Sequence, residues 1–272
     1  MPRDDIEHAP SPGGESASGR LRRRLLRETT FQISVDVDNI ERGLAVAGAS
    51  LAAGVTIVEM GTPLLKCAGV YNVVPAFRRR FPQALLLADM KTMDGGSFEA
   101  RAVYQGGGNI IDFLALAGTA SARGICAVRD EFRAADPHTP RLAFADILVP
   151  HQGPAGPAVE IAERMLEAGV DGVGIHLQLD ARRADPALFQ SSYLADVAQA
   201  IFAQIGTRAP VQVVGGLTTA QAAGLARAGL KAFVISGNFG HTDPARGHNR
   251  PPAEIEADVR AFIREVAAAR PE

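Results

Sequence analysis

Acidic, basic and imidazole side chains recur where short apolar segments of this chain end. The candidates for chemistry are Asp36, Glu59, Asp89, Lys91, Asp94 and His176. Burying several charged groups together is costly unless they pair with one another or bind a metal ion. If the fold brings these segments to one place, the sequence predicts an active site made of carboxylates, a lysine and a histidine.

The pair Asp89 and Lys91 indicates oxyanion or acid–base chemistry. The two residues are two positions apart in a predicted strand, so their side chains share one face. A neighbouring carboxylate keeps a lysine charged and aimed, and a charged lysine can stabilise an oxyanion or deliver a proton. Asp94 follows within one short turn and could join this network from its own subunit or from a neighbouring one. A simple salt bridge at the strand end is the alternative.

Glu59 and Asp89 end adjacent predicted strands and together suit Mg²⁺, which binds one or two carboxylates and keeps several waters. His176 could also be a metal ligand, but a general acid or base is the more natural role beside oxygen ligands. A hydrogen-bonded core histidine is the alternative for His176. Asp38 and Asp146 also follow strands, and each taken alone is expected to be a helix cap or a surface charge. The fourth strand ends in apolar residues 113–116 and offers no obvious catalytic group.

Glycines follow the last two predicted strands in a pattern that favours anion binding. Gly215 and Gly216 precede a helix that begins near Thr218, and Gly237 and Asn238 end the final strand. In a parallel barrel, the loops after strands seven and eight recurrently bind phosphate through backbone N–H groups and a helix N-terminus. A tight turn between strand and helix also needs glycine, which is the alternative explanation for this pair.

The elements that must position these residues alternate regularly along the chain. Short segments rich in Val, Ile, Leu and Phe predict strands at 31–37, 55–60, 84–90, 109–114, 141–147, 171–177, 210–214 and 231–236. Stretches with helical spacing lie between them, among them 40–53, 95–106, 155–168, 219–228 and 253–269. This alternation predicts an α/β fold, a (β/α)8 TIM barrel in a single domain over residues 30–272. A doubly wound open sheet is the structural alternative.

Composition limits the remaining possibilities. Residues 1–29 form an N-terminal extension, with a disordered tail predicted over 1–19 and a helical lead-in over the arginine-rich 20–27. A net charge of −2 gives no support for binding nucleic acid or an anionic membrane. No segment is apolar and long enough to span a bilayer, and the N-terminus lacks the apolar core of a signal peptide. Two cysteines, Cys67 and Cys126, make no disulfide framework, so we expect a cytoplasmic protein.

One segment closely resembles a known enzyme family. Residues 87–96, Leu-Ala-Asp-Met-Lys-Thr-Met-Asp-Gly-Gly, resemble the signature of 3-hexulose-6-phosphate synthases. These enzymes belong to the orotidine 5′-monophosphate decarboxylase superfamily, as do the 3-keto-L-gulonate 6-phosphate decarboxylases. Residues 58–63 resemble the Glu-x-Gly-Thr-Pro element of the synthase and keto-gulonate branch. Residues 31–39, 176–180 and 214–216 are similar to further family segments, so the resemblance covers about residues 31–240.

The resemblance implies a role for each candidate residue. Glu59 and Asp89 would bind Mg²⁺, and His176 would transfer protons. The polar network would be completed by Asp36, Lys91 and Asp94. It also implies a homodimer with active sites at the interface. The implied reaction forms an enediolate from a sugar phosphate; in a synthase this adds formaldehyde to ribulose 5-phosphate, so the expected activity is that of an aldehyde-lyase.

The chain also departs from the family pattern. Gly237 and Asn238 stand where the family has Gly-Gly or Gly-Arg, and the missing arginine argues against a keto-gulonate decarboxylase. The basic segment that follows suggests that His241, Arg246 or Arg250 contacts the substrate's anionic group instead. A decarboxylase, a related lyase with a different and even unphosphorylated substrate, and a non-catalytic sugar-phosphate sensor remain the alternatives.

Overall fold

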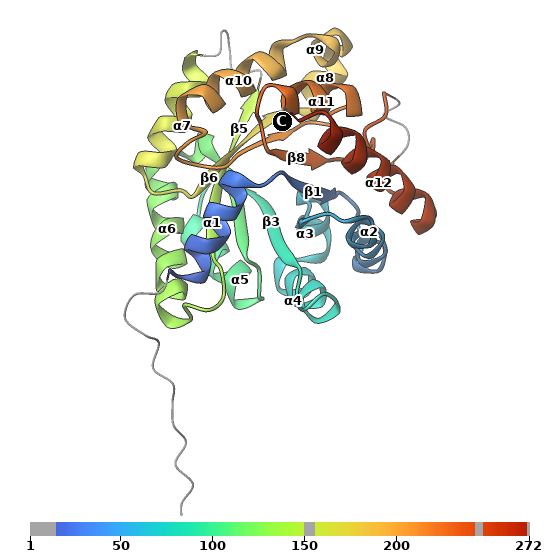
Figure 1. The fold of residues 1–272 in the computed structure, drawn as a ribbon. Helices are drawn as coiled ribbons and strands as arrows, with labels where there is room; N and C mark the ends of the chain where they lie inside the picture. The colour runs from blue at the N-terminus through green and yellow to red at the C-terminus, as the bar shows by residue number, and fades with distance from the viewer. Residues whose placement is uncertain (1–14, 150–155, 243–246, 271–272) are drawn as a thin grey trace, which may run out of the picture.

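The computed structural model describes residues 15–149, 156–242 and 247–270. Parallel strands pair in chain order and close into a barrel of eight, surrounded by helices (Figure 1). The strands are β1 (Thr30–Val35), β2 (Ile57–Met60), β3 (Leu85–Thr92), β4 (Ile110–Leu114), β5 (Leu142–Val149), β6 (Gly172–Leu177), β7 (Val211–Val214) and β8 (Ala232–Ile235). The predicted (β/α)8 barrel is therefore confirmed, and the open sheet is excluded because β1 pairs with β8.

The predicted helices are confirmed at nearly the expected bounds, and further short helices precede or follow them. The α-helices are α1 (Ala17–Arg27), α2 (Ile40–Ala53), α3 (Thr62–Ala68), α4 (Val70–Arg80), α5 (Gly96–Gln105), α6 (Gly118–Ala135), α7 (Gly156–Glu167), α8 (Leu179–Ala184), α9 (Pro186–Gln190), α10 (Tyr193–Ile205), α11 (Thr219–Arg227) and α12 (Pro252–Ala268), with one 3-10 turn, η1 (Ala115–Ala117). Asn39 caps α2 through its side chain, and Gly54, with φ 107°, ends it. Within the described residues, no helix has the length and apolar character needed to cross a bilayer.

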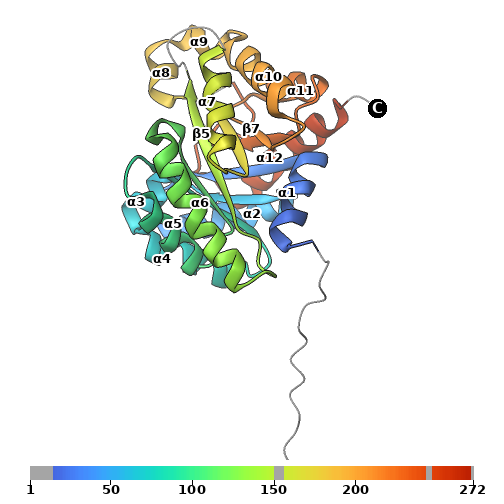
Figure 2. The same ribbon diagram turned by 90° about the vertical axis from the view of Figure 1, so that its left-hand side faces the viewer.

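The extension before the barrel closes its N-terminal end. Leu21 and Leu25 of α1 pack against barrel residues such as Leu87 and Phe144, which fill the bottom of the interior. Helix α1 begins at Ala17, inside the range that was predicted to be a tail, because Ser16 caps it and its apolar residues find this cluster. Figure 2 shows α1 at the end of the barrel opposite α8. Chemistry is therefore confined to the other end, where the strands finish.

Strand β3 is irregular where the most important candidates lie. Its pairing with β4 shifts register between Asp89 and Thr92, so that Met90 and Lys91 bulge out of the ladder. Lys91 has φ 45°, a left-handed conformation that residues other than glycine seldom adopt. Such backbone strain persists only where surrounding contacts hold it, and it clusters at functional sites. The bulge turns Lys91 toward the interior of the barrel mouth.

Candidate active site

A cavity of about 560 Å³ opens at the C-terminal ends of the strands. It brings together nearly all of the candidates chosen from the sequence. Those that line it are Asp36, Glu59, Asp89, Lys91, His176, Gly215, Gly216, Gly237 and Asn238. Asp94 does not line it: this side chain is exposed and accepts a hydrogen bond from the Gly95 amide. Within one chain, therefore, the Asp94 carboxylate lies outside the cluster it was predicted to join.

Lys91 is the centre of an ion-pair network. Its Nζ lies 2.9 and 2.8 Å from the two carboxylate oxygens of Asp89 and 3.2 Å from Oδ2 of Asp146. Thr62 donates a further hydrogen bond of 2.7 Å to Asp89. Burial alone would lower the pKa of Lys91, but the charges of Asp146 and Asp89 outweigh it and raise the pKa. The lysine is therefore a fixed cation at the floor of the cavity.

The expectation that Asp146 would be a helix cap or a surface charge was wrong. It is buried, and its Oδ2 lies 3.0 Å from Nδ1 of His176 as well as near Lys91. Burial raises the pKa of Asp146, but the neighbouring His176 and Lys91 reverse this effect and lower it below the usual range. An ionised Asp146 therefore orients the imidazole of His176 through Nδ1.

Glu59 is a buried carboxylate with an excess of negative charge around it. Gln32 donates a hydrogen bond of 2.6 Å to it, and Gln212 supports Gln32 with another of 2.8 Å. Burial raises the pKa of Glu59 strongly, and the charges of Asp89 and Asp36 raise it further. A cation next to Glu59 would offset both effects, because its charge favours the ionised carboxylates.

Strand β4 contributes a polar group after all. Asp112 is buried beside Asp89 in the β3–β4 pairing, and its Oδ1 has no hydrogen-bond partner among the described residues. Burial, followed by the charges of Asp146 and Asp89, raises its pKa well above the usual range. Asp112 does not line the cavity, so the expectation that this strand offers no obvious catalytic group stays a prediction.

The predicted anion loops adopt the required conformations. Gly215 and Gly216 have φ of 122° and 72°, and a side chain on Gly215 would come within 2.8 Å of Leu177. Helix α11 follows directly, capped by Thr218 and Gln221. Asn238 holds the two loops together, donating hydrogen bonds of 2.8 Å to the carbonyl oxygen of Gly216 and of 2.8 Å to that of His241. The asparagine thus fixes the geometry of the loop pair.

A basic side chain from another loop reaches these glycines. Arg182 of α8 donates a hydrogen bond of 3.1 Å to the carbonyl oxygen of Gly215, and its guanidinium lies directly over Gly216. The alternative donors suggested by the sequence point elsewhere: Arg250 and His241 both pair with Asp258 of α12, at 2.6 and 3.2 Å. Arg246 lies outside the described residues. Neither Arg250 nor His241 lines the cavity, and the anion contact expected of them stays a prediction.

Comparison with known proteins agrees with this geometry. A family model described as "Orotidine 5'-phosphate decarboxylase / HUMPS family" matches residues 29–237. The chain belongs to this family. Membership makes it an enzyme of the carbon–carbon lyase class, and the resemblance seen in its sequence motifs is confirmed.

Individual members of the orotidine decarboxylase / HUMPS family align along most of their length. A 3-hexulose-6-phosphate synthase from Mycobacterium gastri is 29% identical over 216 residues, which are 79% of this chain and 94% of the relative. A solved 3-hexulose-6-phosphate synthase superposes with a TM-score of 0.67 at 25% identity, over 86% of this chain and 99% of that one. The 3-keto-L-gulonate-6-phosphate decarboxylase of Vibrio cholerae, at 20% identity and a TM-score of 0.67 over 90% and 100% of the two chains, shows the shared fold.

The sequence contained a signal for the two buried acids Asp112 and Asp146, which its motifs do not include. Asp112 lies two positions after Ile110, and Asp146 lies two positions after Phe144; both of these apolar residues belong to the interior cluster. Because side chains alternate along a strand, each aspartate must face the same interior. A carboxylate at an interior position of an apolar strand thus indicates a buried acid inside the barrel. No comparable signal marks Arg182, which lies on a loop helix.

Proposed function

We propose that this lyase is a Mg²⁺-dependent aldehyde-lyase that acts on a ketose phosphate, most like 3-hexulose-6-phosphate synthase. It would join formaldehyde to ribulose 5-phosphate or cleave the product. The observation that carries the proposal is the shared carboxylate of Asp146, which binds the lysine and the histidine at once. The arrangement provides a fixed cation and an oriented base at one wall of the same cavity.

The carboxylates fit a magnesium ion. Glu59 and Asp89 both line the cavity and are buried. The pKa of Glu59 is raised first by burial and then by the charges of Asp89 and Asp36. No group of three or more His, Cys, Asp or Glu residues is placed to hold a metal within the described ranges. A site with two carboxylates is nevertheless sufficient for Mg²⁺, which keeps waters as its other ligands. When bound there, the ion would supply Lewis-acid polarisation of substrate oxygens.

The protein's own side chains account for the remaining chemistry. Nε2 of His176 would accept a proton from the substrate carbon next to the carbonyl group, and Asp146 would stabilise the resulting imidazolium. The electron pair of that C–H bond forms a C=C bond while the π pair of the carbonyl group moves onto its oxygen. This gives the enediolate, whose negative charge Lys91 stabilises. The enediolate carbon then forms a bond to the carbon of formaldehyde, and the new alkoxide takes up a proton.

A decarboxylase and a non-catalytic sensor are the competing functions. A decarboxylase would form the same enediolate by losing carbon dioxide, but an arginine directly after Gly237, which argued for that branch, is replaced by the structural Asn238. A sensor would need only the anion loops. The buried ion pairs of Lys91 with Asp89 and Asp146 cost desolvation energy. A sensor would not need them, so their presence favours an enzyme.

Proton exchange tests the enediolate chemistry separately from the choice of second substrate. We expect the enzyme with Mg²⁺ to exchange a C1 hydrogen of ribulose 5-phosphate for deuterium in D2O, as followed by ¹H NMR without formaldehyde. A His176→Gln variant should lose this exchange by about a hundredfold or more, because the base is gone. Tight binding of ribulose 5-phosphate without exchange would instead support the sensor.

Arg182 provides a test of phosphate recognition. We expect Arg182→Ala to raise KM for the phosphorylated substrate about tenfold to a hundredfold while kcat changes little, because a charged contact to a non-reacting group is lost. Steady-state kinetics would measure both constants. Arg250→Ala is the matched control, since Arg250 pairs with Glu254 and Asp258 and should leave KM unchanged. A raised KM in Arg250→Ala, with an unchanged KM in Arg182→Ala, would place the phosphate at the loop after β8.

We also propose a homodimer in which Asp94 serves the site of the neighbouring subunit. Asp94 is exposed between two exposed apolar side chains, Met93 at 50% and Phe98 at 68%, and Leu116 on the adjacent loop is 67% exposed. All follow the C-terminal ends of β3 and β4, so they lie at the same end of the barrel as the cavity. Large exposed apolar side chains grouped in this way favour a self-association surface.

A single charge should disrupt this surface. We expect Phe98→Glu to convert the protein to a monomer in sedimentation velocity and to lower kcat/KM about a hundredfold, because each site would lose the partner's Asp94. Gln105→Glu is the control: it adds the same charge at an exposed position on the other end of α5. A Phe98→Glu monomer with full activity would show that Asp94 is not shared.

A further inference from the structure

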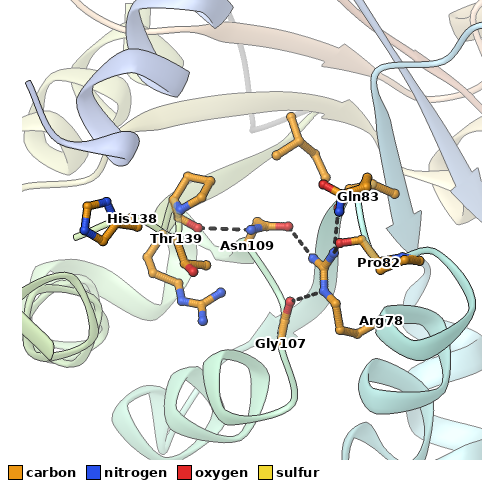
Figure 3. A pocket seen from close by; sticks show the side chains of 11 residues that line it. Arg78, Pro82, Gln83, Gly107, Asn109, His138 and Thr139 are labelled. Atoms are coloured by element: carbon orange, nitrogen blue, oxygen red, sulfur yellow. Dashed lines mark hydrogen bonds between the residues drawn. The ribbon is translucent and has the colours of Figure 1, made fainter. Parts of the chain in front are cut away.

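A second cavity, of about 420 Å³, lies at the N-terminal ends of β3, β4 and β5. It is therefore at the opposite end of the barrel from the active site. Its walls are the end of α4 and the loops that precede these three strands, and they combine apolar side chains with two arginines. Figure 3 shows Arg78 extending from α4 toward Gly107 and Asn109, with His138 and Thr139 across the cavity.

Arg78 forms one side of this cavity and is held rigidly. Its Nε donates a hydrogen bond of 3.0 Å to the carbonyl oxygen of Gly107, and its Nη2 donates one of 2.7 Å to Oδ1 of Asn109. Its Nη1 lies 2.8 Å from the carbonyl oxygen of Pro82. Nη1 also donates to the carbonyl oxygens of Phe81 and Ala84. All of these partners are neutral, and Nη2 retains a second N–H for another acceptor.

Arg141 supplies a second and more deeply buried guanidinium. Only 9% of the residue is exposed; Nη1 donates a hydrogen bond of 2.7 Å to the carbonyl oxygen of Gly108, while Nε has no partner among the described residues. The guanidinium also lies 5.8 Å from the ring centre of Tyr104. These contacts are again neutral, and they leave several N–H donors unused.

Neither arginine contacts a carboxylate within the described part of the chain. The lining contains no acidic residue, and the hydrogen bonds of Arg78 and Arg141 go to carbonyl and amide oxygens. Burial lowers the pKa of Arg141 and has a larger effect than the charge of nearby Asp136, which raises it. Burial also lowers the pKa of the half-buried Arg78. A bound anion would favour the charged form of both guanidiniums.

We propose that this cavity binds the phosphate group of a small metabolite. The guanidiniums of Arg141 and Arg78 would hold the phosphate, and His138 and Thr139 at the rim would contact the part that carries it. Guanidinium groups match phosphate oxygens through paired, charge-assisted hydrogen bonds. The site is separate from the catalytic cavity, and it does not depend on which substrate the lyase uses.

Site-resolved NMR can test this binding. Inorganic phosphate would be titrated into the ¹⁵N-labelled protein, and the amides of Gly107, Gly108 and Asn109 would report on the second cavity. The amides of Gly215 and Gly216 would report separately on the catalytic loops. Gln83 is an exposed residue of the cavity wall, which allows charge to be added without disturbing the core. Gln83→Glu and Gln83→Lys form a matched pair of opposite charge.

The proposal predicts saturable shifts at Gly107, Gly108 and Asn109. Gln83→Glu should raise the dissociation constant for phosphate measured at these amides about threefold or more. Gln83→Lys should lower it, because a charge in the cavity wall acts directly on the anion. The Gly215 and Gly216 curves should stay unchanged in both variants. Absence of saturation up to about 20 mM phosphate, equal affinity in the two variants, or tighter binding of malonate than of phosphate would overturn the proposal.

Discussion

Asp89→Asn lowers kcat/KM of the lyase reaction by about a thousandfold or more, which is the largest effect expected from a single change. Asp89 binds Lys91 through both carboxylate oxygens and accepts a hydrogen bond from Thr62. The amide keeps the shape but loses the charge, so it would neither hold the lysine nor serve as a magnesium ligand. Steady-state kinetics and Mg²⁺ binding by calorimetry would measure the two losses.

Asp38→Asn is the control for this prediction. Asp38 also follows β1 at the mouth of the barrel, but its side chain is exposed and accepts a hydrogen bond from Asn39. We expect Asp38→Asn to retain activity within about twofold, as surface substitutions usually do. An Asp89→Asn protein that folds, binds Mg²⁺ normally and keeps its turnover would contradict the assignment of the site.

Asp146→Asn is expected to lower kcat by about a hundredfold to ten-thousandfold with little change in KM. The carboxylate orients the imidazole of His176 and holds Lys91, and both groups act on the reacting atoms rather than on the phosphate. Because the native pKa of Asp146 lies below its unfolded value, its contribution to stability is present above about pH 4 and is lost as the pH falls further. The asparagine variant should lack this acid-sensitive component in urea unfolding.

Asp112→Asn is the matched control for Asp146→Asn. Asp112 is an equally buried neighbour, but burial and the charges of Asp146 and Asp89 raise its pKa, which favours the protonated acid. Asparagine has nearly the same shape as a protonated carboxyl group and the same charge. We therefore expect activity within about tenfold of the original. Equal losses in the two variants would show that Asp146 acts through packing alone.

The barrel could be predicted because its pattern is local. Apolar segments of strand length alternate with helical spacing, and β1 to β8 all overlap the predicted ranges. The contact between Asp89 and Lys91 could also be predicted, because residues two positions apart along a strand lie on the same face. The bulge at Lys91 could not, because it depends on how β3 pairs with β4.

The remaining site residues depend on contacts that no local pattern contains. The sequence around Asp146 does not show its partners. Only the closed barrel places it between Lys91, which is 55 residues away in the chain, and His176, which is 30 residues away. Arg182 and Arg250 are both basic residues after a strand, and the sequence does not distinguish the one over Gly216 from the one paired with Asp258. Asp94 lies outside the cavity of its own chain, and its proposed role depends on contacts between two chains.

Carbon–carbon bond formation between formaldehyde and ribulose 5-phosphate is the most direct test of the account. ¹³C-labelled formaldehyde would be followed by NMR in the presence of Mg²⁺ and again after chelation. The account predicts that the label enters a six-carbon sugar phosphate, and that chelation stops the reaction. Failure to incorporate the label by protein that binds Mg²⁺, together with release of carbon dioxide from a 3-keto sugar acid phosphate, would contradict it and establish the decarboxylase instead.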